Sequence, residues 1–162
     1  MKKHFTPKKI SLGIITLLII FQFFRIDKST KALIPEKDFI LLSKANPEVT
    51  ALLKNSCYDC HSNQINYPWY TNIAPVSWWV KNHINEGSHH LNFSDWGNYS
   101  SRKADHKLKE CIEMIKGGEM PLESYTWMHG SAKLSKEQQS ALVAFFTFLR
   151  TYESEKPKPS QS

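Results

Sequence analysis

Residues 57–61 read Cys-Tyr-Asp-Cys-His, and this pentapeptide decides how the rest of the chain is interpreted. Two thiols three positions apart, at the end of a helix, can each bond to one vinyl group on the same edge of a porphyrin. The imidazole that follows is then carried beneath the ring, where a neutral nitrogen can bind iron. Cys-x-x-Cys-His is the attachment pattern of c-type haem. We therefore predict one covalently attached haem c at Cys57 and Cys60, with His61 as the proximal iron ligand.

The same cysteine pair could instead form a disulfide, a redox-active thiol pair or half of a zinc site. A zinc site would need a second Cys pair or a His pair at matching spacing, whereas the only further cysteine, Cys111, stands alone. A thioredoxin-like centre would need a βαβ context, and no such pattern is present. The sequence therefore favours covalent haem. Cys111 is predicted to be a small buried hydrophobe on a helix stripe.

The sixth iron ligand is predicted to be Met120, within the sequence GGEMP of residues 117–121. Pro121 restrains the residue before it toward an extended backbone, and a thioether ligand raises the potential and suits reversible electron transfer. Met120 could instead fill a gap in the core. A second histidine ligand would lower the potential. The competing ligands that stay open are His83, His89, His90, Met128 and His129.

Apolar residues at helical spacing predict four helices in the body of the chain. They run from Asn46 toward Cys57, from Pro75 to Glu86 with a stop at Gly87, from near Asp105 to Gly117, and from Ser135 onward. No alternating strand pattern is present, so we predict a mainly α-helical, cytochrome-c-like domain. The tryptophans that could line the haem, although core positions are their default, are Trp69, Trp78, Trp79 and Trp96.

The N-terminus contains an uncharged apolar run, Ile10–Phe24, preceded by four lysines at positions 2, 3, 8 and 9. A positive region before an apolar run is typical of an export signal. Fifteen residues of helix rise about 22 Å, less than the ~30 Å hydrocarbon layer, although flanking Lys and Arg side chains can extend the span. No small-residue cleavage site follows the run. We predict an uncleaved transmembrane signal anchor, with a cleaved signal as the alternative.

The formal net charge of +6 lies entirely in residues 1–31, and residues 32–162 are formally neutral. Positive charge beside an apolar run indicates membrane topology, so a nucleic-acid partner is not expected. The predicted organisation is a signal anchor and start of a tether at 1–31, a tether at 32–45, a haem domain at 46–152 and a disordered tail at 153–162.

Several motifs occur in a familiar order: NSCYDCHSNQINYPWYTNIAPVSWWVKNHINEG, then LNFSDW, then GGEMPLESYTWMH. Over roughly residues 40–150 the chain resembles the bacterial haem-binding domain family of single-haem c-type cytochromes. The resemblance implies covalent haem at Cys57 and Cys60, His61 as proximal ligand, Met120 as distal ligand and a short N-terminal membrane segment. It implies no particular substrate or partner.

The expected function is one-electron transfer by a carrier rather than an enzyme, at the outer face of the cytoplasmic membrane and therefore in the periplasm. Its partners would be unidentified redox proteins and the machinery that attaches haem to c-type cytochromes. One alternative is a haem-based sensor in which a small gas displaces Met120. The other is a peroxidase-like protein with an open sixth position and His83 or His129 as its acid-base group.

Overall fold

The computed structural model describes residues 6–155, with the backbone alone for 152–155. The described residues form helices and loops without a strand, so the predicted mainly α-helical class is confirmed. The α-helices are α1 (Pro7–Phe21), α2 (Phe39–Ser43), α3 (Pro47–Ser56), α4 (Tyr58–His61), α5 (Val76–His90), α6 (Ser101–Gly117), α7 (Glu123–Thr126) and α8 (Lys136–Glu155). Short 3-10 helices are η1 (Pro35–Lys37), η2 (Trp69–Asn72), η3 (Phe93–Asn98) and η4 (Gly130–Ala132).

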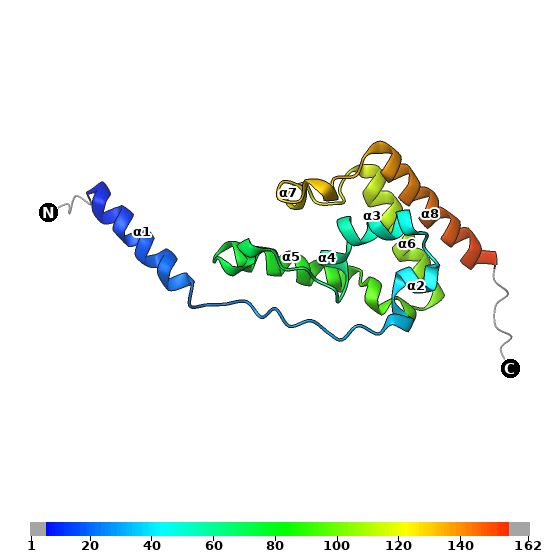
Figure 1. Ribbon diagram of the computed structural model, residues 1–162, viewed down its shortest axis with the longest axis horizontal. Helices are drawn as coiled ribbons and strands as arrows, with labels where there is room; N and C mark the ends of the chain where they lie inside the picture. The colour runs from blue at the N-terminus through cyan, green and yellow to red at the C-terminus, as the bar shows by residue number, and fades with distance from the viewer. Residues whose placement is uncertain (1–5, 156–162) are drawn as a thin grey trace.

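The long helices α6 and α8 lie side by side and supply one half of the core (Figure 1). Their apolar residues recur at helical spacing, so each helix buries one stripe and leaves its polar face in water. The α3–α4 segment and η3 close the core from the other side. Residues buried in this cluster include Leu53, Tyr58, Phe93, Leu108, Ile112, Leu142 and Phe146.

Several helix ends follow the predicted capping chemistry. The Asn46 side chain accepts a hydrogen bond from the backbone of Val49 (2.8 Å) at the start of α3. Ser135 and Gln138 form the predicted capping box at α8, with each side chain bonding the backbone N–H of the other residue at 3.2 and 2.8 Å. Both arrangements satisfy N–H groups that a helix start leaves unpaired.

Two predicted helix ends are wrong. The third helix begins at Ser101 rather than near Asp105, because the Ser100 hydroxyl caps it by accepting from the backbone of Lys103 (3.3 Å). The second helix does not stop at Gly87 but continues to His90. Glycine weakens a helix without ending it, and here α5 continues through Gly87 while packed closely against α4.

The predicted tether, 32–45, packs onto the domain in its second half. Phe39 is fully buried at the centre of an aromatic cluster, 4.7 Å from the ring of Trp96 and 5.0 Å from that of Phe93. Asp38 beside it is also buried. The extended stretch is therefore the part between α1 and η1, which runs alongside the body in Figure 1.

The predicted transmembrane helix is not supported. Helix α1 forms, but none of the helices between residues 6 and 155 is both long enough and apolar enough to cross a bilayer. The physical reason is length, because 15 residues of helix rise only about 22 Å. The lysines at positions 2 and 3 lie outside the described residues. The predicted disordered tail, 153–162, begins too early, because α8 continues through residue 155, and the rest of it lies outside the described residues.

Candidate functional site

The cysteine motif forms a single helical turn at a break in the chain. Helix α3 ends at Ser56, Cys57 leaves helical geometry (φ −127°), and α4 restarts at Tyr58. The carbonyl of Cys57 then accepts hydrogen bonds from the backbone of Cys60 (3.2 Å) and His61 (3.0 Å). This turn brings the predicted haem-binding residues together in one short element. Both cysteines are free of disulfides and half-buried.

The His61 ring is held by two backbone carbonyls of α5 and its C-terminal end. Its Nδ1 lies 2.9 Å from the oxygen of Gly87 and 3.2 Å from that of Leu91. A carbonyl can only accept, so Nδ1 carries the proton and the lone pair is on Nε2. No hydrogen bond to Nε2 is present within the described part of the chain. This is the tautomer and the orientation that a metal-binding imidazole needs.

Burial also keeps His61 neutral. Removing the ring from water lowers the pKa of His61 below its usual value, because the charged form is the one that burial disfavours. The two carbonyl contacts act in the opposite direction without overcoming it. A neutral imidazole is the form that binds iron.

Gly87 brings α5 into direct contact with the motif. A Cβ at this position would lie 2.9 Å from the carbonyl oxygen of Cys60 and 3.4 Å from Cε1 of His61. The nearer clash is with backbone, which cannot rotate away. Only glycine lets the helix approach closely enough for its carbonyl to reach the His61 ring. Sequence reasoning treated Gly87 as a helix stop; the available signal was a glycine inside a helical pattern.

Neither thiol of the motif is activated toward the thiolate form. Burial raises the pKa of Cys57 to about 12 and that of Cys60 to about 11. Cysteines that exchange disulfides have lowered pKa values, because the thiolate is the reactive form. The site is therefore unlike a thioredoxin centre. Cys111 is partly buried against the core, and burial raises its pKa to about 12, in agreement with a structural role.

Tyr58 anchors the motif to the core. Its hydroxyl donates to the buried carboxylate of Asp38 (2.8 Å), which also accepts from the backbone of Ile40 (3.0 Å) and the hydroxyl of Ser94 (3.4 Å). The Tyr58 ring stacks on Phe93 with centroids 5.4 Å apart. Burial, with the adjacent carboxylate, raises the pKa of Tyr58. Sequence analysis did not identify this Tyr58–Asp38 pair.

Asp59 ties the motif to the segment after Met120. The Tyr125 hydroxyl donates to Asp59 Oδ2 (2.8 Å), and the Tyr125 ring stacks on His129 at 4.2 Å. His129 Nδ1 contacts the carbonyl of Tyr125 (3.1 Å), so its Nε2 faces the Tyr70 hydroxyl at 3.5 Å. Tyr125 of α7 therefore contacts the cysteine turn, and His129 after α7 joins it to Tyr70 of η2.

Met120 lies in the tight turn that follows α6. Gly118 ends the helix in the left-handed conformation (φ 72°), as the predicted stop requires. The backbone of Met120 donates to the carbonyl of Met114 (3.3 Å), and its side chain is half-buried. Its role as distal ligand stays a prediction.

Apart from His129, which is half-buried in the Tyr125 cluster, the competing ligands are not tied to the cysteine turn by a contact in the described part of the chain. His83 donates from Nδ1 to the carbonyl of Trp79 (2.9 Å) and packs on that indole. His89 and His90 are exposed at the end of α5, and Met128 is exposed after α7. Trp96 belongs to the core around Phe39 rather than to the motif.

These residues fit a covalently bound haem. Two free thiols and a neutral imidazole with an unprotonated Nε2 share one turn, and the backbone behind the ring is fixed by Gly87. Among residues 6–155, no group of three or more His, Cys, Asp or Glu could by itself hold a metal ion.

Comparison with known proteins gives one family. A model described as a haem-binding domain matches residues 16–147. Neither the curated proteins nor the solved structures gave a match. The matched range includes the cysteine turn, α5, the Met120 turn and α7.

Proposed function

Because the chain belongs to the haem-binding domain family, it is a haem-binding protein, and we propose that it is a mono-haem c-type cytochrome. Haem would be bonded through Cys57 and Cys60, with iron bound by Nε2 of His61. The observation that supports this most directly is the pair of carbonyls that leave His61 protonated on Nδ1.

We propose further that the protein transfers single electrons and is not an enzyme. Bound haem supplies one-electron redox chemistry at its iron. The chain holds the imidazole through Gly87 and Leu91, and Tyr58 and Asp59 hold the turn from two sides. A rigid proximal side keeps the reorganisation between oxidation states small. Met120 is the proposed distal ligand, which would raise the potential.

The proposed location is the outer face of the cytoplasmic membrane, in the periplasm where the cell has one. The apolar helix α1, with Lys8 and Lys9 in its first turn and Arg25 shortly after its end, would hold the domain there. Haem attachment at Cys57 and Cys60 would depend on the cytochrome c maturation machinery. The redox partners would be proteins.

Covalent attachment is tested by producing the full chain in a host competent for cytochrome maturation. The intact mass should include one haem, and the colour should stay with the protein in acidified organic solvent. The variant Cys57→Ala/Cys60→Ala should lose covalent haem. Cys111→Ala is the matched control, since it removes a buried thiol outside the motif and should keep the haem. Free thiols at both positions in the wild type would contradict the proposal.

The distal ligand is tested by the spectrum of Met120→Ala. Replacement of a thioether ligand should change the spin state of the ferric protein, and Met128→Ala should not. An unchanged spectrum in Met120→Ala would remove Met120 from this role.

One arrangement favours a second candidate, a haem sensor or peroxidase-like protein with an open sixth position. His129 Nε2 faces the Tyr70 hydroxyl (3.5 Å), and Tyr125 links the same cluster to Asp59. Such a cluster could transfer protons at a catalytic haem. Carbon monoxide separates the candidates, because it should leave the reduced spectrum of a six-coordinate carrier unchanged and shift that of an open site.

A further inference from the structure

Helix α1 presents apolar side chains on every face. The large apolar residues between Ile10 and Ile20 are 43–66% exposed, and no residue of α1 is buried. Exposed apolar surface of this extent is unfavourable in water and marks a surface that meets an apolar partner. Because no polar face interrupts it, the helix suits the interior of a lipid layer better than a one-sided protein groove.

The C-terminal end of α1 is fixed to the domain. The Gln22 side chain pairs with the backbone of Ala74 in both directions, donating at 3.0 Å and accepting at 3.1 Å. The Trp78 indole donates to the carbonyl of Phe24 (2.9 Å), and its ring packs edge-on against Phe21 at 5.0 Å. The apolar helix and the start of α5 therefore share a defined junction.

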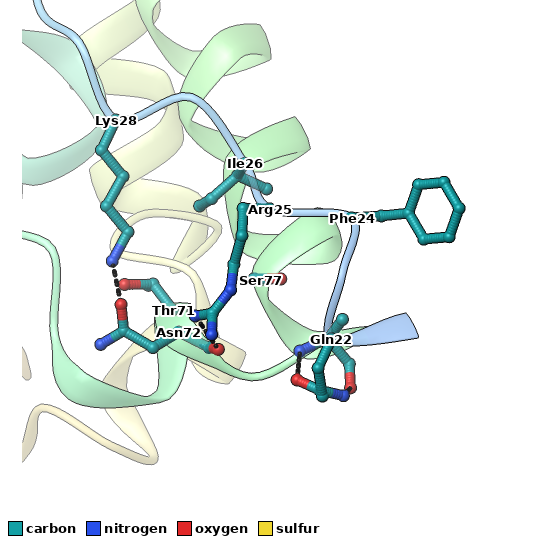
Figure 2. A pocket seen from close by; sticks show the side chains of 9 residues that line it. Gln22, Phe24, Arg25, Ile26, Lys28, Thr71, Asn72 and Ser77 are labelled. Carbon is teal, nitrogen blue, oxygen red and sulfur yellow. Dashed lines mark hydrogen bonds between the residues drawn. The ribbon is translucent and has the colours of Figure 1, made fainter. Parts of the chain in front are cut away.

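A cavity of about 230 Å³ lies at this junction. Figure 2 shows Arg25 and Lys28 descending from the extended segment toward Asn72 of η2, with Gln22 and Phe24 on the side of α1. No carboxylate lines the cavity, and two cations do. The carboxylate of Asp27, the nearest acidic residue in the sequence, accepts hydrogen bonds from the backbone N–H and the hydroxyl of Ser29. The cavity is therefore positively charged.

Arg25 and Lys28 each have N–H donors beyond those used in their contacts with Asn72. Arg25 donates Nη1 to the carbonyl of Asn72 (3.1 Å), and Lys28 donates to its amide oxygen (2.8 Å). A guanidinium has five N–H donors and an ammonium three, so each can also bind an anion. These contacts aim both side chains at one place, as a phosphate site requires. The hydroxyl-bearing Thr71 and Ser77 complete the polar wall.

The residues around the cavity indicate whether its ligand is a free anion or the headgroup of a lipid. Phe24 and Ile26 line the same cavity, which lies directly beside the apolar end of α1. Exposed Trp79, Ile73 and Val76 lie on the neighbouring η2–α5 region. Aromatic residues and cations at the end of an apolar helix are typical of the headgroup level of a membrane. Pockets that enclose a complete small-molecule ligand measure about 300–1,000 Å³. The volume of this cavity is below that range and suits a lipid headgroup better.

We propose that this cavity binds the phosphate of an anionic phospholipid, whose acyl chains lie along α1. The proposal rests on the membrane attachment proposed above. Since Arg25 and Lys28 contact Asn72 and Gln22 contacts Ala74, the bound lipid would join the membrane surface to η2 and α5. The haem-bearing domain would thereby take one orientation over the membrane instead of swinging on its tether.

The test uses the full holoprotein in mild detergent, titrated with phosphatidylglycerol or phosphatidylcholine of identical acyl chains and followed by native mass spectrometry. The wild type should retain one phosphatidylglycerol in preference to phosphatidylcholine. The variant Arg25→Gln/Lys28→Gln should lose this preference by about tenfold or more, because each cation near anionic lipid contributes severalfold in affinity. Arg25→Lys should keep part of it.

The matched control is Lys8→Gln/Lys9→Gln, which removes two charges from the other end of α1 and should retain the preference. Equal loss in both double variants would overturn the cavity and leave only general charge attraction. Full competition by inorganic phosphate would overturn the lipid as the ligand. Flotation with vesicles tests the anchor separately. Protein that floats normally but shows no lipid preference contradicts the headgroup site alone, and protein that does not float contradicts membrane attachment.

Discussion

Tyr58 and Asp59, the two residues between the motif cysteines, face different parts of the protein. Tyr58 points inward to the buried carboxylate of Asp38, and Asp59 accepts from the hydroxyl of Tyr125 at the site's edge. The haem-binding turn is thus held to the core by one residue and to the segment after Met120 by the other. Attachment chemistry leaves both positions free to vary, so their identities serve the fold of this chain.

At this scale we predict that Tyr58→Phe lowers the free energy of unfolding by about 1–3 kcal/mol, because it removes a donor from a buried carboxylate. Tyr125→Phe is the matched control. It deletes the same hydroxyl, but Asp59 is partly exposed, so water can replace the lost bond at a cost below about 1 kcal/mol. Urea unfolding of both variants checks this, and a larger loss in Tyr125→Phe would contradict it.

At the scale of elements, the contact between α4 and α5 is the one on which the site depends. Helix α5 supplies both backbone oxygens that orient His61, one from Gly87 within it and one from Leu91 at its C-cap. The motif itself is only one turn long and cannot fix its own imidazole.

We predict that Gly87→Ala reduces stability by about 1–3 kcal/mol, as overpacking does, and lowers the yield of attached haem. Helix propensity alone would favour alanine by about 1 kcal/mol, so a loss must come from the clash with Cys60. Gly130→Ala is the control, since a Cβ there meets nothing within 4 Å. Haem content and thermal unfolding are the measurements. A stabilised Gly87→Ala would show that α5 can approach without glycine.

Helices α6 and α8 are joined by an ion pair at their exposed edge. Arg150 Nε lies 2.7 Å from Asp105 Oδ1, and Nη2 lies 3.2 Å from Oδ2. These hydrogen bonds lower the pKa of Asp105 below its usual value. Because the charged form is favoured in the folded state, the stabilisation is present above about pH 4, the unfolded pKa, and is lost as the pH falls through the lowered folded value.

Asp105→Asn should therefore lower the free energy of unfolding by no more than about 1 kcal/mol at pH 7, because the two side chains are 34% and 46% exposed and water screens them. The difference from wild type should shrink as the pH drops below about 4. Denaturant unfolding across this pH range tests the sign. A difference independent of pH would mean that the asparagine acts through packing.

At the scale of the whole molecule, part of the segment before α3 belongs to the folded core. Residues between α1 and η1 run along the body, and the chain then enters the core at Phe39 and at Asp38, which accepts from Tyr58 (Figure 1). Burying a phenylalanine stabilises a small domain by several kcal/mol, so its loss is severe.

We predict that, behind the same foreign export signal, a protein beginning at residue 32 folds and takes up haem, whereas one beginning at residue 46 does not. The longer form keeps Asp38 and Phe39, whereas the shorter form deprives Tyr58 of its acceptor and Phe93 of the adjacent Phe39 ring. Circular dichroism and haem content distinguish the two. Cooperative unfolding of the shorter form would show that the predicted boundary at residue 46 is sufficient.

The sequence alone determined the helical class, the starts of α3, α5 and α8, and the residues proposed to hold haem. These depend on local features, namely hydrophobic periodicity, helix capping and the spacing of Cys57, Cys60 and His61. Each such feature is determined by residues only a few positions apart in the sequence. Only the tertiary structure decided the His61 tautomer, the need for glycine at position 87, the two partners of the motif and the cavity beside α1. Each of these comes from contacts between residues 20–66 positions apart, and no local pattern encodes which distant residues will meet.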